Sequence, residues 1–183
     1  MKHRAVFFLI ILTILLFSCS QQSEWSVCFS PHGGCTQAIV QEINQAKKSV
    51  LVQAYSFTSA PIAETLSRAN KREGMKVEVI LDKSQKTEKY SSADFLANSG
   101  IQVRIDSAHA IAHNKVIIID EETVITGSFN FTRAAEERNA ENLLIIKDKK
   151  LAQKYLRNWK EHAEHSEPYT KNQKHTKKEV LNK

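Results

Sequence analysis

The sequence predicts a single α/β domain in which helices cover both faces of one β-sheet. Short apolar segments rich in β-branched residues alternate along the chain with segments whose apolar residues follow helical spacing. Of the 183 residues, about 165 follow an apolar N-terminal segment, which is enough for one domain with a substantial core. Charged residues make up 25% of the chain, and no internal repeat or change of composition precedes the C-terminal tail. One soluble globular domain is therefore expected.

The first half of this domain is expected to contain three strands and three helices. The strands are predicted at 25–29, 50–55 and 77–81, and the helices at 36–47, 61–72 and 92–98. Pro61 suits the first turn of the second helix, which ends at Gly74. Ser92 can cap the third helix, which ends near Asn98 and Gly100.

The second half is expected to contain four strands and one long helix. The strands are predicted at 101–105, 116–119, 123–126 and 141–146, and the helix at 150–162. The run Val116 to Ile119 is apolar, β-branched and too short for a helix, which is typical of a strand buried on both faces. Functional side chains are then expected where strand ends meet loops.

Residues 1–18 have the features of a secretory signal. Lys2 and Arg4 precede an apolar run that is short for a membrane span, although an uncleaved anchor is the alternative. Residues 16–19 resemble a bacterial lipoprotein cleavage box, which makes Cys19 a candidate for lipidation. We therefore expect an exported protein that is periplasmic, attached to a membrane as a lipoprotein, or secreted. Cleavage after Ser18 would lower the formal charge from +6 to +4 because two basic residues would be lost.

The folded domain is expected at 24–165 and a disordered basic tail at 166–183. After Pro168 the chain is polar and basic and has no apolar periodicity. The tail is interpreted as a solvated segment, and an arm that contacts nucleic acid is the alternative.

The candidate catalytic residues gather around the strand at 116–119. Alternation along this strand puts His113 and Lys115 on one face, and Gly127 permits a close turn that brings Ser128 and Asn130 beside them. Lys115, Ser128 and Asn130 can donate hydrogen bonds to anionic phosphate oxygens. His113 can attack phosphorus or transfer a proton near neutral pH. This set of side chains predicts chemistry on a phosphodiester.

The spacing H-x-K-x4-D-x6-G-S-x-N, in which the acidic position is Asp120, resembles the signature of the phospholipase D superfamily. Segments 54–58, 98–101, 127–132 and 139–142 are similar to those of the small bacterial Nuc-type endonucleases, which carry one such HKD motif per chain. The resemblance covers about residues 25–165. It implies a phospholipase D-like mixed β-sheet with helices on both faces, in a single domain.

The resemblance also implies a homodimer, because two copies of the motif form one active site in that family. One His113 would form a covalent phosphohistidine, and His113 of the partner subunit would protonate the leaving oxygen. The family position of Glu141 accepts a hydrogen bond from the other nitrogen of His113, and Asp120 is given a supporting role in the site. Lys115, Ser128 and Asn130 would bind the substrate, so no cofactor and no catalytic metal are expected.

The cysteines fit an oxidising compartment. Cys28 and Cys35 form an even pair around a short loop, and a disulfide between them is the preferred interpretation. The alternative is a zinc site formed by Cys28, His32 and Cys35, for which a fourth ligand is not evident.

Two other kinds of site are not favoured. Asp106, His109 and His113 would face one side of a helix, but they lie between two predicted strands, so no metal site is assigned to them. His109 is expected in a loop near the substrate. The five glycines fit neither a P-loop nor a dinucleotide fingerprint, which argues against ATP or NAD.

The expected substrate is DNA, with RNA as a second candidate, cleaved without sequence preference. The positive charge favours a polyanion, and candidate contacts are Lys47, Lys48, Lys71, Arg72, Lys83, Lys86, Lys89 and Arg133. Phe129 and Phe131 flank Asn130 and are candidates for stacking on bases, but packing of at least one of them in the core is favoured. The alternatives are a phospholipase acting on a membrane lipid and, from another class, a noncatalytic nucleic-acid-binding protein.

Overall fold

The computed structural model describes residues 23–170 and contains one mixed sheet of eight strands. The strand order is β1-β7-β6-β5-β2-β3-β4-β8, in which β2, β3 and β4 are parallel and the other neighbouring pairs are antiparallel. The strands are β1 (Glu24–Ser30), β2 (Ser49–Ala54), β3 (Lys76–Asp82), β4 (Gln102–Asp106), β5 (Lys115–Ile119), β6 (Thr123–Gly127), β7 (Glu141–Lys147) and β8 (Glu167–Pro168). The predicted α/β class and its mixed sheet are confirmed.

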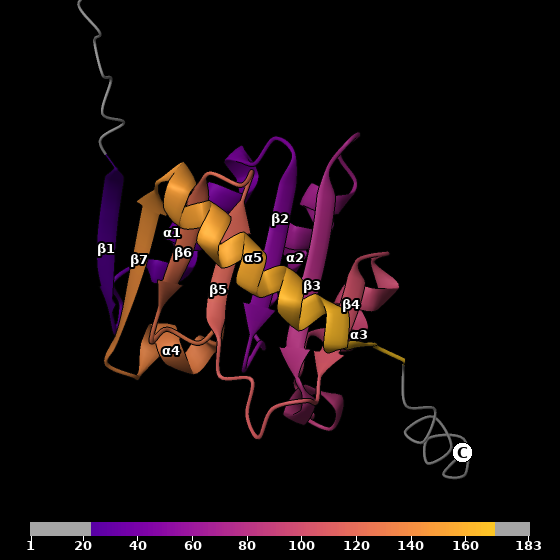
Figure 1. Cartoon of the computed structure of the whole chain (residues 1–183). Helices are drawn as coiled ribbons and strands as arrows, with labels where there is room; N and C mark the ends of the chain where they lie inside the picture. The colour runs from indigo at the N-terminus through magenta and orange to yellow at the C-terminus, as the bar shows by residue number, and fades with distance from the viewer. Residues whose placement is uncertain (1–22, 171–183) are drawn as a thin grey trace, which may run out of the picture.

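Helices cover both faces of the sheet (Figure 1). They are α1 (Cys35–Gln45), α2 (Ala60–Asn70), α3 (Ala93–Asn98), α4 (Arg133–Glu137) and α5 (Lys149–His165), together with the 3₁₀-helix η1 (Lys83–Lys86). Helix α5 crosses one face diagonally, from near β7 to β4, while α1 and α2 lie on the opposite face. The short elements α4, η1 and β8 were not predicted from the sequence.

Two apolar clusters hold these layers together. On the α5 face, Leu156 and Trp159 pack with Val116 and Ile118 of β5, and Trp159 Nε1 donates a 3.1 Å hydrogen bond to the Val52 main-chain oxygen. The larger cluster lies between the other face and helices α1, α2 and α3. All five residues of β5 are buried, which confirms the expected strand covered on both faces and makes it a rigid support for the residues at its start.

One end of the sheet brings together the segments that carry the predicted catalytic residues. Lys115, at the start of β5, pairs with Ala54 of β2, which pairs with Leu81 of β3, which in turn pairs with Ile105 of β4. The carboxyl ends of β2, β3 and β4 therefore meet the start of β5. We call this the Lys115 end of the sheet.

The C-terminal boundary differs from the prediction. Glu167 and Pro168 pair with β4, and the Tyr169 hydroxyl donates a 2.9 Å hydrogen bond to Asp94 Oδ1. The domain therefore extends at least four residues beyond the predicted boundary at His165. The apolar ring of Tyr169 packs against the core, a contact that the polar composition of the tail does not indicate.

The predicted signal at 1–18, the lipidation candidate Cys19 and most of the predicted tail lie outside the described residues. Within residues 23–170, no helix has both the length and the apolar character needed to cross a membrane.

Candidate active site

His113 and Lys115 lie where the connector of residues 107–114 enters β5. The Lys115 side chain is buried, and its Nζ donates a 3.0 Å hydrogen bond to the main-chain oxygen of His113. The His113 side chain is exposed. The start of β5 thus holds a buried ammonium against the main chain of a residue whose imidazole is accessible, and these are the two residues that the sequence singled out.

Tyr55 joins this pair from the end of β2. Its ring centroid lies 4.6 Å from that of His113, and Lys115 Nζ lies 5.0 Å from the same tyrosine ring. The main chain of Tyr55 also donates a 2.8 Å hydrogen bond to the Asn114 oxygen. Sequence reasoning did not name Tyr55 as a site residue, although its place at the end of β2, directly after Ala54, is the signal that could have found it; Ala54 is the residue that pairs with Lys115.

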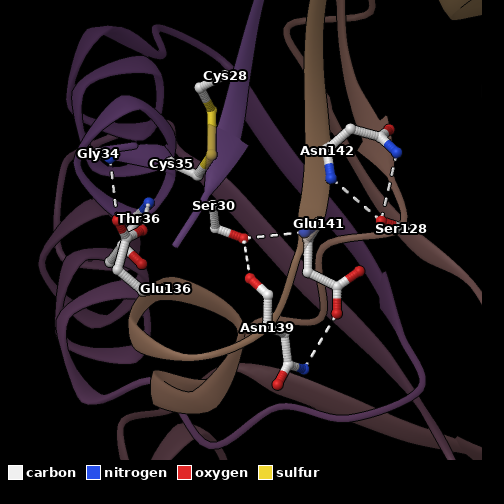
Figure 2. The surroundings of a disulfide bond; sticks show 10 residues. All are labelled: Cys28, Ser30, Gly34, Cys35, Thr36, Ser128, Glu136, Asn139, Glu141 and Asn142. Carbon is white, nitrogen blue, oxygen red and sulfur yellow. Dashed lines mark hydrogen bonds between the residues drawn. A yellow bond between two sulfur atoms is a disulfide. The ribbon is translucent and has the colours of Figure 1, made fainter. Parts of the chain in front are cut away.

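Glu141, the first residue of β7, affects the charge of Lys115. Burial lowers the pKa of Lys115, and the negative charge of Glu141 acts in the opposite direction and raises it. The Glu141 Oε1 atom accepts a 3.1 Å hydrogen bond from Asn139 Nδ2 (Figure 2). Among residues 23–170, Glu141 accepts no hydrogen bond from His113. The expected His113–Glu141 hydrogen bond is therefore not present in the single chain.

Gly127 and Ser128 form a tight turn against Asn142. A Cβ atom on Gly127, whose φ is +152°, would collide with the Asn142 main-chain oxygen, so this position requires glycine. The Ser128 Oγ atom accepts a 3.1 Å hydrogen bond from the Asn142 main-chain nitrogen, as Figure 2 shows. The exposed Ser128 hydroxyl is therefore oriented by β7 at the Lys115 end of the sheet.

Asn130 is enclosed by two core aromatic residues. Phe129 and Phe131 are both fully buried, so the favoured interpretation of core packing is confirmed and the alternative of stacking on bases is wrong. The Asn130 Oδ1 atom is buried and has no hydrogen-bond partner among residues 23–170. Buried polar atoms in folded proteins almost always have partners. This amide is thus available to a ligand or a neighbouring subunit.

Asp120 lies at the opposite end of β5 and outside the site. Its carboxylate accepts hydrogen bonds of 2.8, 2.7 and 2.9 Å from the main-chain nitrogens of Lys47, Lys48 and Ser49. The supporting role in the site predicted for Asp120 is therefore wrong, because a five-residue strand separates it from His113. Asp120 instead fixes the loop between α1 and β2.

Cys28 and Cys35 form a disulfide that joins β1 to the start of α1, as predicted. Both thiols are thereby used, so the alternative zinc site with His32 is wrong. The next residue of β1 on this face is Ser30, whose Oγ atom donates a 2.9 Å hydrogen bond to the Asn139 oxygen and accepts a 3.2 Å hydrogen bond from the Glu141 nitrogen (Figure 2). The disulfide thus braces the strand that supports Glu141.

Asp106 and His109 come together, but His113 is not part of their group. His109 contacts the buried Asp106 carboxylate, whereas His113 packs against Tyr55. Burial acts to raise the pKa of Asp106, but hydrogen bonds with His162, His109 and His165 outweigh it and lower this pKa to about 2.

The basic residues predicted to contact DNA divide between the two ends of the sheet. Those that follow β3 and β6 lie at the Lys115 end, and they are Lys83, Lys86, Lys89 and Arg133. The others precede β2 or β3 at the opposite end, and they are Lys47, Lys48, Lys71 and Arg72. Two guanidinium nitrogens of Arg72 donate to main-chain oxygens of Asn44 and Ile43, which is a structural role. Only the first group can contact a substrate held at His113.

Comparison with known proteins identifies the family. The family described as "Cardiolipin synthase, PLD-like domain" matches residues 39–163. The chain belongs to the phospholipase D superfamily. This phospholipase D-like chain is 49% identical over 138 residues to "Phospholipase D" of Rickettsia prowazekii, an alignment that covers 75% of this chain and 67% of that protein. It is 30% identical over 134 residues to human "Mitochondrial cardiolipin hydrolase", covering 73% of this chain and 53% of the human protein.

Solved structures of the superfamily share this fold. The phospholipase D family member Nuc from Salmonella typhimurium superimposes with a TM-score of 0.77 and 40% identity, covering 81% of this chain and 99% of that one. NucT from Helicobacter pylori gives a TM-score of 0.74 and 26% identity, with 81% and 100% of the two chains covered. The single-motif, Nuc-type fold is therefore confirmed, and the chain is a phosphodiesterase of the phospholipase D family.

Proposed function

We propose that this protein is an endonuclease that hydrolyses phosphodiester bonds of DNA, and of RNA as a second substrate class, without a catalytic metal. The observation that carries the proposal is the exposed His113 imidazole and the buried Lys115 ammonium gathered at the Tyr55 ring, with centroid distances of 4.6 and 5.0 Å. A nucleophile beside a fixed cation suits attack on an anionic phosphodiester.

The reaction would proceed in two steps at a site shared by two chains. A nitrogen of one His113 attacks phosphorus and forms a P–N bond as the P–O bond to the leaving group breaks. His113 of the partner subunit gives its proton to the leaving oxygen. That imidazole then accepts a proton from water, whose oxygen attacks phosphorus and breaks the P–N bond. The enzyme returns to its starting state with one ester bond hydrolysed.

The remaining site residues would stabilise negative charge on the phosphoryl oxygens. Lys115 offers an ammonium, and Ser128 and Asn130 offer a hydroxyl and an amide at the same end of the sheet. Glu141 would keep Lys115 charged, since its own charge opposes the effect of burial on the lysine pKa.

The surroundings of the site favour a nucleic acid. A pocket beside β6 is lined by Arg133, Glu137 and Arg138. Lys83, Lys86 and Lys89 follow β3 at the same end of the sheet. Cations spread on both sides of a phosphodiesterase site can bind the phosphates that flank the bond to be cut. A lipid headgroup with one phosphate, such as that of phosphatidylcholine, offers no such flanking phosphates.

We propose that the active form is a homodimer with the two His113 residues facing each other across its two-fold axis. Each His113 is exposed in the single chain, so a second chain can approach it. Trp25, Val27 and Phe29 of β1 are also exposed, and Phe29 pairs in register with Asn142 of the site. An apolar surface that continues into the site is available to a second copy.

We also propose that the protein is exported and that a lipidated Cys19 can attach it to a membrane. The Cys28–Cys35 disulfide supports an oxidising compartment, because such bonds rarely persist in the cytosol. Mass spectrometry of the protein purified from its own cells would test both the cleavage after Ser18 and the lipid on Cys19.

The substrate can be tested by incubating the purified protein with supercoiled plasmid in EDTA, and separately with vesicles of cardiolipin or phosphatidylcholine. We expect nicked plasmid, intact lipid and no activity in the His113→Asn variant. Activity that EDTA abolishes and Mg²⁺ restores would contradict the proposal of metal-independent catalysis.

A phospholipase is the second candidate, and two observations favour it. Relatives at 49% identity carry the name phospholipase D, and Tyr90, Phe95 and Ile111 are exposed apolar residues in segments that follow β3 or precede β5. Hydrolysis of lipid without plasmid nicking would establish this alternative. Plasmid binding with neither reaction would identify a noncatalytic nucleic-acid-binding protein.

The shared site can be tested by mixing subunits. If each site needs two His113 residues, mixed dimers of wild-type and His113→Asn chains are inactive, so excess variant should suppress the wild-type activity after subunits have exchanged. Asp120→Asn chains, which retain His113 and carry their substitution outside the site, serve as the matched control and should not suppress it. Activity that depends only on the amount of wild-type chain would show that each subunit acts alone.

A further inference from the structure

Four side chains with metal-binding atoms converge away from the His113 site. Asp106 is the last residue of β4 and is fully buried, and His109 follows three residues later in the connector of residues 107–114. His162 and His165 are one helical turn apart at the end of α5. Three separate segments of the chain thus bring histidine and carboxylate groups to one point.

The distances within this cluster suit a single small ion. One ligand atom from each of the four residues lies within 4.8 Å of those from the other three. Asp106 Oδ2 lies 2.6 Å from His162 Nδ1 and 3.3 Å from His165 Nε2, and His109 Nδ1 lies 3.2 Å from the same carboxylate. A tetrahedral ion with bonds of about 2.0–2.1 Å separates its ligand atoms by roughly 3.3 Å. The His109 and His165 contacts match this separation, and the 2.6 Å contact of His162 would lengthen on metal binding.

The three imidazole rings surround the carboxylate almost evenly. Their ring centroids are 4.9 Å apart for His109 and His162 and 5.2 Å apart for each of the other two pairs. One carboxylate can neutralise only one imidazolium, so three protonated rings at this spacing would repel one another. Three neutral imidazoles and one carboxylate form a metal-ligand set, whereas a hydrogen-bonded cluster needs only one histidine beside Asp106.

We propose that Asp106, His109, His162 and His165 bind one divalent transition-metal ion of the zinc class. Three imidazole nitrogens and one carboxylate oxygen favour Zn²⁺ and its neighbours over Mg²⁺ or Ca²⁺, which prefer oxygen ligands. Four protein ligands leave no open position on a tetrahedral ion, which is typical of a structural site rather than a catalytic one.

Neighbouring groups already orient two of the ligands. Asp106 Oδ1 accepts a 3.1 Å hydrogen bond from the Ala108 nitrogen, which turns the chain back toward the carboxylate. Lys83 Nζ donates a 3.0 Å hydrogen bond to the His109 main-chain oxygen. Hydrogen bonds from neighbouring groups to metal-binding residues help to hold those residues in place for a metal.

The position of the cluster assigns the ion a structural role. It would fasten the end of α5 to β4 and to the first residues of the connector, whose last residues are His113 and Asn114. Strands β2 and β3 lie between β4 and β5, so the ion and Lys115 are separated by two strands although they share one end of the sheet. The ion would stabilise the connector without contacting the substrate.

The test is metal binding to the untagged protein, with Zn²⁺ as the probe. After dialysis against chelator and return of Zn²⁺, we expect one equivalent per chain and a rise in melting temperature. The His162→Gln and His165→Gln variants should each bind Zn²⁺ at least tenfold more weakly. Co²⁺ in place of Zn²⁺ should give the visible absorption bands of a tetrahedral ion, which a hydrogen-bonded cluster cannot produce.

The matched control is His32→Asn, which removes a histidine outside the cluster at a position whose φ of 60° asparagine tolerates. It should bind Zn²⁺ like the wild type. Equal binding by all variants would place the ion elsewhere and overturn the proposal, and so would the absence of stoichiometric binding by the wild type. His165 lies near the end of α5 and its side chain is partly exposed, so its variant is expected to remain folded. Nuclease activity is not a readout here, so the result is independent of the proposed reaction.

Discussion

Lys115 Nζ lies 3.0 Å from the main-chain oxygen of His113, so the lysine is anchored to the backbone of the residue whose ring it accompanies. The buried lysine also lies close to the Tyr55 ring, and the negative charge of Glu141 raises its pKa against the effect of burial. A group held in this way needs no reorganisation when negative charge develops beside it, which is the condition for electrostatic stabilisation of a transition state.

The charge of Lys115 should depend on Glu141. Because burial lowers the pKa of Lys115 and Glu141 raises it, Glu141→Gln should lower this pKa further, so the lysine loses its proton at a lower pH than in the wild type. The measurement is the ¹³C NMR shift of Lys115 Cε against pH, with Lys115→Met used to assign the signal. An unchanged titration curve would show that the two groups do not interact.

His113→Asn should reduce activity and leave stability unchanged, whereas Asp120→Asn should reduce stability and leave activity unchanged. The first should abolish activity and leave the melting temperature nearly unchanged, because the His113 side chain is exposed. The second keeps the φ of 53° that asparagine tolerates but weakens three main-chain hydrogen bonds, at a cost of about 1–2 kcal/mol in the free energy of unfolding. Its kcat/KM should stay within about twofold of the wild type. A large loss of kcat/KM in the folded Asp120→Asn variant would show that Asp120 does have a supporting role in the site.

The parts of the fold and site that the sequence predicted are those governed by local patterns. The β-branched run of β5, Pro61 in the first turn of α2 and the spacing from His113 to Asn130 are all visible in short segments. The role of Asp120 was misjudged because its partners, Lys47 to Ser49, lie about 70 residues earlier in the chain. Motif spacing fixes residue types and does not show which end of a strand faces the substrate.

The four-residue cluster was missed for the same physical reason. Asp106 and His109 were seen together, but His162 is 56 residues further along and reaches them only because α5 crosses the sheet diagonally. The available local signal was His162 at the end of the predicted helix, followed three residues later by His165.

Removal of the disulfide should lower the free energy of unfolding while the folded protein keeps most of its activity. The Cys28→Ala, Cys35→Ala double variant opens a loop with a sequence separation of 7, for which chain entropy predicts a loss of roughly 2.5 kcal/mol. Urea unfolding of this variant and of the reduced wild type should agree. Ser30→Ala shows the effect of disturbing the site without opening the disulfide. It keeps the disulfide and removes the hydroxyl that contacts Asn139 and Glu141. Reduction that leaves the stability unchanged would contradict a structural role for the bond.

Tyr169 should make the stability of the domain sensitive to alkaline pH. Burial and the nearby Asp94 raise its pKa to about 12, above the ordinary value of 10.0, so the neutral phenol is favoured in the folded state. The contribution is fully present below the unfolded-state pKa and is lost as pH rises through the folded-state value. Wild-type protein should therefore lose more stability between about pH 10 and about pH 12 than Tyr169→Phe, in which the other titrating groups are unchanged. At neutral pH the same variant should be about 1 kcal/mol less stable, because the hydrogen bond to Asp94 is missing. A second comparison is the melting temperature of chains ending at His165 and at Thr170. If the stability of wild type and Tyr169→Phe changes with pH in parallel, and the two shortened chains melt at the same temperature, residues 166–170 do not belong to the domain.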